Sequence, residues 1–230
     1  MLRTALLIAR KDIRLIILGG SGLIQALMLG LLLIFVFSLA QDIGEVISPR
    51  AAATIFWLAS TFCLVLAGNM CHGLESVNNA RAGLLLSPVP VQGIWLGKAL
   101  AILVILLLAQ LCFLPASVAF LRQQVYGAGA TLGGLLLIDF GLAALASLLG
   151  ALVQGRSARE SLLSVILFPL LVPALLAGIS FGEAAFTPAF IGAGGAASQQ
   201  GEWLGLTLAF DAIFLAAGLV LFPFMYTDED

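Results

Sequence analysis

Two carboxyl groups in apolar surroundings are the residues whose type and position most suggest chemistry in this sequence. Asp139 and Asp211 each interrupt a long hydrophobic run. An ionisable side chain in hydrocarbon is costly, so such a residue commonly serves a substrate or proton pathway. At the helical rise of about 1.5 Å per residue, both lie about 12–14 Å from the same end of their runs. Gln25 and Gln110 are candidate neighbours, and a common donor or a shared proton is one arrangement. The alternative is that each carboxyl is protonated or hydrogen-bonded inside a helix bundle and serves only helix association.

The motifs of soluble catalysts and of metal sites are missing from the sequence. It contains no GxSxG, HExxH or GxxxxGK[ST] pattern, and GIWLGK at 93–98 has the wrong spacing for a phosphate loop. Because His72 is the single histidine of the sequence, a metal site built on several histidines is not expected. Cys63, Cys71 and Cys112 form no CxxC pair and are predicted to be small buried hydrophobes. We therefore expect no enzyme activity, no ATPase site, no bound metal and no cofactor held by the chain itself.

The composition predicts an all-α integral membrane protein. Of the 230 residues, 62% are hydrophobic and only 10% are charged, whereas soluble domains carry about 25% charged residues. A spanning helix needs about 20 predominantly apolar residues. Six stretches qualify, and they form a single transmembrane domain over residues 1–230 with no predicted contact to nucleic acid. The expected spans are about 15–40, 51–73, 96–121, 130–153, 161–181 and 203–226.

The distribution of Lys and Arg predicts the orientation of the six spans. With the N-terminus inside, eight basic residues fall on one side, whereas only Arg50 and Arg122 fall on the other. Cytoplasmic segments carry the excess of basic residues, so both termini are predicted to be cytoplasmic. The eight are Arg3, Arg10, Lys11, Arg14, Arg81, Lys98, Arg156 and Arg159.

The first fourteen residues have the pattern of an amphipathic helix. On a helical wheel their three arginines fall within about 40° of one another. We predict an interfacial helix on the cytoplasmic leaflet over residues 1–14, in contact with the lipid bilayer. The alternative is that the charges act only as a topology signal. The arginines are Arg3, Arg10 and Arg14, and the apolar sector holds Leu2, Leu6, Ala9 and Ile13.

The segment between the second and third spans combines a short apolar helix with a stiff turn. Pro88 and Pro90 disfavour helical conformation in the residues before them, so the next helix must begin after the second proline. Before them, residues 80–86 are predicted to form a short helix that ends in three leucines. An apolar helix followed by a rigid turn suits docking into a groove of another protein.

The residues of this segment resemble the corresponding loop of ABC-2 type permeases. An acidic residue, a short helix with paired leucines, then S-P-V and a downstream G-K are similar to the loop that meets the ATP-hydrolysing subunit in that class. The resemblance implies a coupling loop made of Glu75, Arg81, Leu84, Leu85, Ser87, Pro88, Val89 and Pro90.

A second stretch narrows the resemblance. The fifth span reads LLSVILFPLLVPALLAG at 162–178, which resembles the double-proline span of the haem exporter protein B family (CcmB), the permease of the cytochrome c maturation system. The resemblance implies a multi-pass protein of the bacterial inner membrane that works as a homodimer. Its implied partners are a separate P-loop ATPase subunit, which holds the ATP, and other cytochrome c maturation membrane proteins. Haem is then a candidate substrate of the complex, to be moved or released with a haem chaperone.

Two further expectations concern how such a permease would work. Pro169 and Pro173 lack backbone donors and are expected to make the fifth span bent or hinge-like. Arg156, Arg159 and Glu160 are expected to form a second cytoplasmic contact with the ATPase. Because the exterior segments contain no histidine, we expect no axial haem ligation by this chain.

Two other functions remain open at this point. One is an ABC-2 permease for another substrate, such as a lipid or a drug. The other is an ion-coupled secondary transporter that uses Asp139 and Asp211 as its relay. Dependence on a separate ATPase distinguishes the first from the second.

Overall fold

The computed structural model describes residues 1–40, 47–76, 83, 89–126, 128–152, 159–188 and 196–227. The elements in this part of the chain are helices, and six of them are long and apolar enough to cross a membrane. The chain is therefore a multi-pass helical membrane protein, as its composition predicts. The helices are α1 (Leu2–Gly19), α2 (Ser21–Leu39), α3 (Pro49–Ser76), α5 (Val91–Phe120), α6 (Ala128–Leu152), α7 (Arg159–Phe186) and α8 (Ala196–Thr227).

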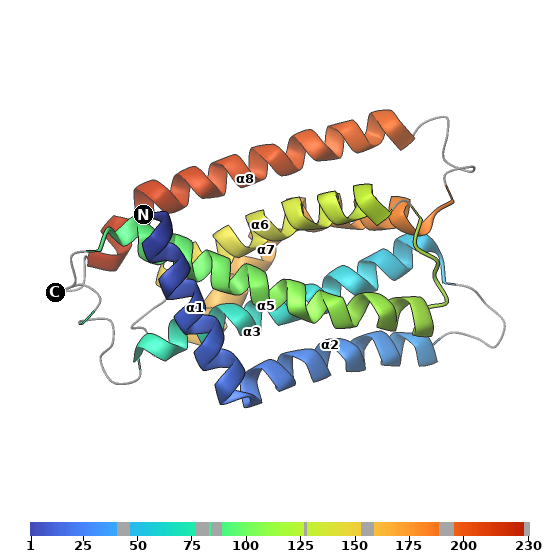
Figure 1. The fold of residues 1–230 in the computed structure, drawn as a ribbon. Helices are drawn as coiled ribbons and strands as arrows, with labels where there is room; N and C mark the ends of the chain where they lie inside the picture. The colour runs from blue at the N-terminus through green and yellow to red at the C-terminus, as the bar shows by residue number, and fades with distance from the viewer. Residues whose placement is uncertain are drawn as a thin grey trace.

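The six long helices run side by side as one bundle, and α1 crosses the first half of α5 obliquely (Figure 1). The start of α1 and the end of α8 lie at the same end of the bundle, on the left in the figure, together with the end of α3 and the start of α5. An even number of crossings requires this arrangement. We call this end the termini end. Its assignment to the cytoplasm stays a prediction from the count of basic residues.

The junction between α1 and α2 corrects the expected start of the first span. The sequence predicted a span over 15–40 after a helix that ends at residue 14, but α1 continues to Gly19 and α2 begins at Ser21. Gly20 adopts a positive φ of 61°, which glycine tolerates without steric penalty. The chain turns at this glycine, and the apolar residues before it belong to α1.

Two other helix boundaries differ from the expected spans. The third span begins at Val91 rather than near residue 96, because Pro90 stands in extended conformation (φ −63°, ψ 127°) and the helix starts directly after it. The fifth span continues to Phe186 rather than ending near 181. Glu183 looks like a loop residue in the sequence, but it pairs with Arg50 at the start of α3 and remains helical.

Small residues let the helices approach closely at several levels of the bundle. Gly30 of α2 lies against the ring of Phe113, Gly178 of α7 against Trp57, and Gly218 of α8 against Trp95. A Cβ atom at any of these glycines would overlap the aromatic ring. Close helix approach through small residues is the usual packing mode inside membranes.

The prediction that all three cysteines are buried is wrong for one of them. Cys63 and Cys71 are buried, but Cys112 is exposed on the outer face of α5. An apolar run does not distinguish a face turned to the bundle from a face turned to lipid, since both are hydrophobic.

Candidate functional site

The segment between α3 and α5 falls only partly within the part of the chain that the structure describes. Glu75 lies in the last turn of α3 by its backbone. The side chains outside the described residues are those of Glu75, Arg81, Leu84, Leu85, Ser87 and Pro88. The same holds for the expected second contact: Arg156 lies outside the described residues, and Arg159 and Glu160 are placed only by their backbone, in the first turn of α7.

Val89 and Pro90 join this segment rigidly to α5. The carbonyl of Pro90 accepts a hydrogen bond from the backbone N–H of Gly93 at 2.8 Å. Val89 is half-buried and packs against the apolar cluster that contains Ile94 and Trp95. This confirms that the helix begins directly after the second proline. A displacement of the segment would therefore act on the first turns of α5.

The first turns of α5 also provide the surface on which α1 packs. We call this surface, centred on Gly93 and Gly97, the seat of α1. Gly93 and Gly97 lie one helical turn apart on the face that meets α1. A Cβ at Gly97 would stand 2.9 Å from the carbonyl oxygen of Ala5 and 2.8 Å from the Cβ of Ile8. These distances leave no room for a side chain. In the sequence, GIWLGK lacks the spacing of a phosphate loop and supplies the downstream G-K of the permease resemblance, but its two glycines also have the spacing of a helix-packing pair.

A buried lysine links α5 to α3. The Nζ of Lys98 donates a hydrogen bond to the carbonyl oxygen of Cys71 at 3.0 Å, and the side chain of Lys98 is 0% exposed. The two helices are those on either side of the 77–88 segment. We call this contact the α3–α5 link. The sequence named Lys98 only as a topology charge and as part of the G-K pair, because burial of a cation is decided by packing.

Two neighbouring contacts extend this buried region to α6. The hydroxyl of Ser147 donates to the carbonyl oxygen of Trp95 at 3.2 Å. His72 of α3 is buried against Gly150 of α6, and its Nδ1 lies 3.0 Å from the carbonyl oxygen of Gly68. At the termini end of the bundle, hydrogen bonds that are shielded from solvent therefore link α3 to α5 and α5 to α6.

Asp139 forms a polar cluster with residues of two neighbouring helices. The amide Nε2 of Gln110 on α5 donates to the Oδ1 of Asp139 at 2.9 Å and to the hydroxyl of Ser60 on α3 at 3.3 Å. Asp139 is fully buried. Its Oδ2 and the Oε1 of Gln110 have no hydrogen-bond partner among the described residues. The cluster therefore fixes three helices to one another and leaves two acceptor atoms inside the bundle.

Asp211 approaches α6 from another side. Its carboxyl lies directly against Gly141, and its two oxygens have no hydrogen-bond partner within the described part of the chain. Residues 139 and 141 of α6 are about 200° apart around the helix axis. Asp139 therefore projects from one face of α6, whereas Asp211 of α8 packs against a different face, at Gly141. Gln110 donates to Asp139, whereas Gln25 is exposed on the outside of α2. The structure places Asp139 of α6 and Asp211 of α8 at neighbouring levels of the bundle, and no donor among the described residues is shared by the two acids.

Two replacements of Asp139, by leucine and by asparagine, distinguish the contribution of its hydrogen bond from that of its charge. Asp139→Leu removes the closer of the two acceptors of the buried Gln110 amide and leaves only the 3.3 Å contact with Ser60, so we expect it to lower the free energy of unfolding by about 1–3 kcal/mol. Asp139→Asn keeps a carbonyl acceptor and is expected to stay within about 1 kcal/mol of the parent. Thermal unfolding in detergent micelles measures both, with the exposed Gln25→Leu as control. A leucine variant as stable as the parent would show that the cluster does not support the fold.

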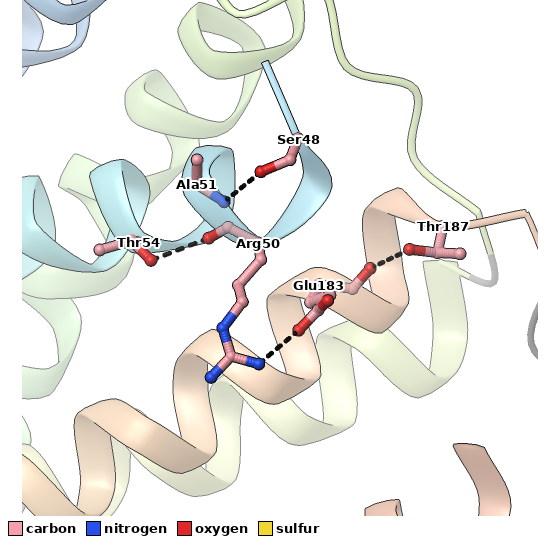
Figure 2. Close-up of polar contacts among 6 residues, drawn as sticks. All are labelled: Ser48, Arg50, Ala51, Thr54, Glu183 and Thr187. Carbon is pink, nitrogen blue, oxygen red and sulfur yellow. Dashed lines mark hydrogen bonds and ion pairs between the residues drawn. The ribbon is translucent and has the colours of Figure 1, made fainter. Parts of the chain in front are cut away.

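The opposite end of the bundle carries a surface ion pair. Figure 2 shows the side chain of Arg50, at the start of α3, reaching Glu183 near the end of α7, with 3.3 Å between Nη1 and Oε2. The hydroxyl of Ser48 accepts the N–H of Ala51 at 3.3 Å and caps α3. Both charged side chains are exposed, and pairs of this kind contribute at most about 1 kcal/mol. The pair joins the start of α3 to the end of α7 and contributes little to stability.

An apolar pocket lies beside this pair, between α3, α5, α6 and α7. Aromatic side chains form much of its wall, among them Phe56, Trp57, Phe181 and Phe186. None of the described residues that line it carries a charged side chain. Within the described residues, no group of three His, Cys, Asp or Glu side chains is arranged to hold a metal ion.

Comparison with known proteins identifies one relationship. A protein-family model described as "CcmB protein" matches residues 3–227, nearly the whole chain. Searches among curated proteins and among solved structures each gave no match. The matched range includes the α3–α5 link, the seat of α1 and both proline-containing motifs.

Proposed function

The chain belongs to the CcmB protein family, and from that premise we propose that it couples ATP hydrolysis on a separate subunit to haem handling during cytochrome c maturation. Family membership implies a membrane-embedded permease subunit of a haem exporter rather than an enzyme. The observation that carries the proposal is the match over residues 3–227, which includes the six spans. The bacterial inner membrane, a homodimer and a P-loop ATPase partner are part of the proposal.

The coupling would start at the 77–88 segment. ATPase closure at the termini end would displace this segment, and Val89 and Pro90 would transmit the displacement to the first turns of α5. The α3–α5 link supports this route, because a charged hydrogen bond joins the two helices that flank the segment. The proposed contacts within it are Arg81, Leu84, Leu85, Ser87 and Pro88, and Glu75 in the last turn of α3 is the proposed contact directly before it.

The fifth span supplies the proposed moving element. Pro169 and Pro173 both lie inside α7, which is continuous from Arg159 to Phe186. Each proline removes one backbone donor and so weakens the helix locally. Pro169 is exposed and Pro173 half-buried. A helix weakened on its outer face is suited to bend when its first turn, with Arg159 and Glu160, is moved by the ATPase.

Complementation tests the proposed function directly. In a bacterium whose own CcmB protein has been deleted, the chain should restore haem-stained c-type cytochromes, provided that it pairs with the host's ATPase. Co-purification with an ATPase but no restored cytochromes would indicate an ABC-2 permease for another substrate. Transport driven by an ion gradient without ATP would indicate a secondary transporter and would contradict the proposal. A stoichiometric Soret band in the isolated chain would contradict the expectation that it does not ligate haem.

Charge reversal tests the second proposed contact. We expect the double variant Arg156→Glu, Arg159→Glu to reduce ATPase co-purification by about tenfold or more, because like charges placed in an interface cost several kcal/mol. Arg122→Glu is the control, since this exposed arginine follows the last turn of α5, and α5 ends at the opposite end of the bundle (Figure 1). Unchanged co-purification in the double variant would remove residues 156–160 from the interface.

A further inference from the structure

Helix α1 has two opposite sides of different character. One side packs against the bundle and holds Asp12, the only acidic residue of the helix, which is fully buried. The opposite side carries Arg3, Arg10 and Arg14, which are exposed and lie within about 40° of one another. The centres of these two sides are about 170° apart on the helical wheel. The arginines therefore point directly away from the bundle. The packed side is formed by Ala5, Ile8, Ala9, Asp12 and Ile16.

Exposed leucines border the arginines on both sides. Leu2 and Leu6 lie on one flank and are 71% and 62% exposed, and Leu7 and Leu18 lie on the other and are 60% and 73% exposed. This amount of apolar surface beside a row of cations is unfavourable in water but suits the boundary between headgroups and acyl chains. Arginine side chains reach from such a helix to the phosphate level while their stems cover apolar surface.

The position of α1 along the bundle axis matches the boundary between headgroups and acyl chains. At one end α2 and α5 are level, because the hydroxyl of Ser38 donates to the carbonyl oxygen of Phe120 at 2.9 Å. The 19 residues of α2 span about 28 Å, close to the hydrocarbon thickness of about 30 Å. The 30 residues of α5 span about 45 Å, so α5 extends beyond the start of α2 by roughly ten residues. Gly93 and Gly97, the seat of α1, lie in this extension.

Charge distinguishes between the candidate occupants of the exposed side. A second copy of the chain would present the same row of arginines, and like charges repel. Anionic phospholipid headgroups are complementary to the row and are present at the depth where the leucines require apolar neighbours. We propose that Arg3, Arg10 and Arg14 bind anionic lipid headgroups, and that α1 thereby anchors the start of α5 to the membrane surface. The lipid contact does not depend on the haem function.

The proposal is tested with the full chain in vesicles of phosphatidylcholine that contain spin-labelled phosphatidylglycerol or spin-labelled phosphatidylcholine. Electron paramagnetic resonance measures the fraction of each label that the protein immobilises. We expect a preference for phosphatidylglycerol in the parent. The triple variant R3Q/R10Q/R14Q should reduce this preference by about tenfold or more, because each near-surface arginine contributes a factor of about five.

Two controls keep the result specific. The variant R3K/R10K/R14K retains the charges and the topology signal, so it should retain the preference. R50Q/R122Q removes two exposed arginines, one in the first turn of α3 and one just after α5. These helix ends lie at the opposite end of the bundle (Figure 1), so the preference should be unchanged. Equal selectivity in the parent and the triple Gln variant would overturn the proposal. So would efficient cross-linking of L18C, in a C112S background in cells, to another polypeptide, because a protein would then occupy this surface.

Discussion

Replacing Gly97 with leucine should displace α1 from the start of α5 and abolish the maturation of c-type cytochromes. The side chain would enter the space held by the Ala5 carbonyl oxygen and the Ile8 Cβ, at 2.9 and 2.8 Å from the Cβ position. One of these neighbours is backbone, so the clash is relieved only by moving the helix. We expect the free energy of unfolding to fall by about 1–3 kcal/mol or more, measured by thermal unfolding in detergent.

Two matched variants show whether the effect comes from the α1 seat. Gly205→Leu introduces the same side chain on α8, where no atom of the described residues lies within 4 Å of the Cβ position, and should have little effect. Gly93→Ala adds a methyl group at ordinary contact distance, 3.6 Å from the nearest atom, and should be tolerated. A Gly97→Leu protein with parental stability and activity would show that α1 does not need this contact.

Replacing Lys98 with methionine should uncouple the two helices that flank the 77–88 segment. The change removes a charged hydrogen bond to the Cys71 carbonyl oxygen, which contributes about 1.5–3 kcal/mol. Under the proposed function, ATPase association should persist while cytochrome maturation falls at least about tenfold, the factor that corresponds to about 1.4 kcal/mol. Haem-stained gels measure maturation, and co-purification measures association.

A neutral hydrogen bond in the same region provides the comparison. Ser147→Ala removes the bond to the Trp95 carbonyl oxygen, which contributes about 0.5–1.5 kcal/mol, so maturation should fall much less. Lys98→Arg keeps the charge and the donors and should retain more function than Lys98→Met. If Lys98→Met loses ATPase association together with maturation, the lysine supports the docking surface and not the transmission of movement.

Polar contacts inside the bundle were only partly predictable. Gln110 was named as a candidate neighbour of the acids because it lies in an apolar run, and it does donate to Asp139. Depth along a helix follows from counting residues, so the similar level of the two acids was accessible from the sequence. The sequence did not show that Asp139 and Asp211 lie at different faces of α6, because the rotation of each helix about its axis is set by packing against its neighbours.

The class of the protein follows from the sequence alone, because the hydrophobic length needed to cross a bilayer is encoded locally. The sequence also indicated that α5 begins after Pro90, since Pro88 and Pro90 each disfavour helical conformation in the residue before them. Only the tertiary structure decided which apolar faces meet each other and which meet lipid. That decision buries Lys98, exposes Cys112 and gives α1 its seat on Gly97. The physical reason is that protein and lipid are equally apolar neighbours, so hydrophobicity alone does not set the rotation of a helix in a membrane.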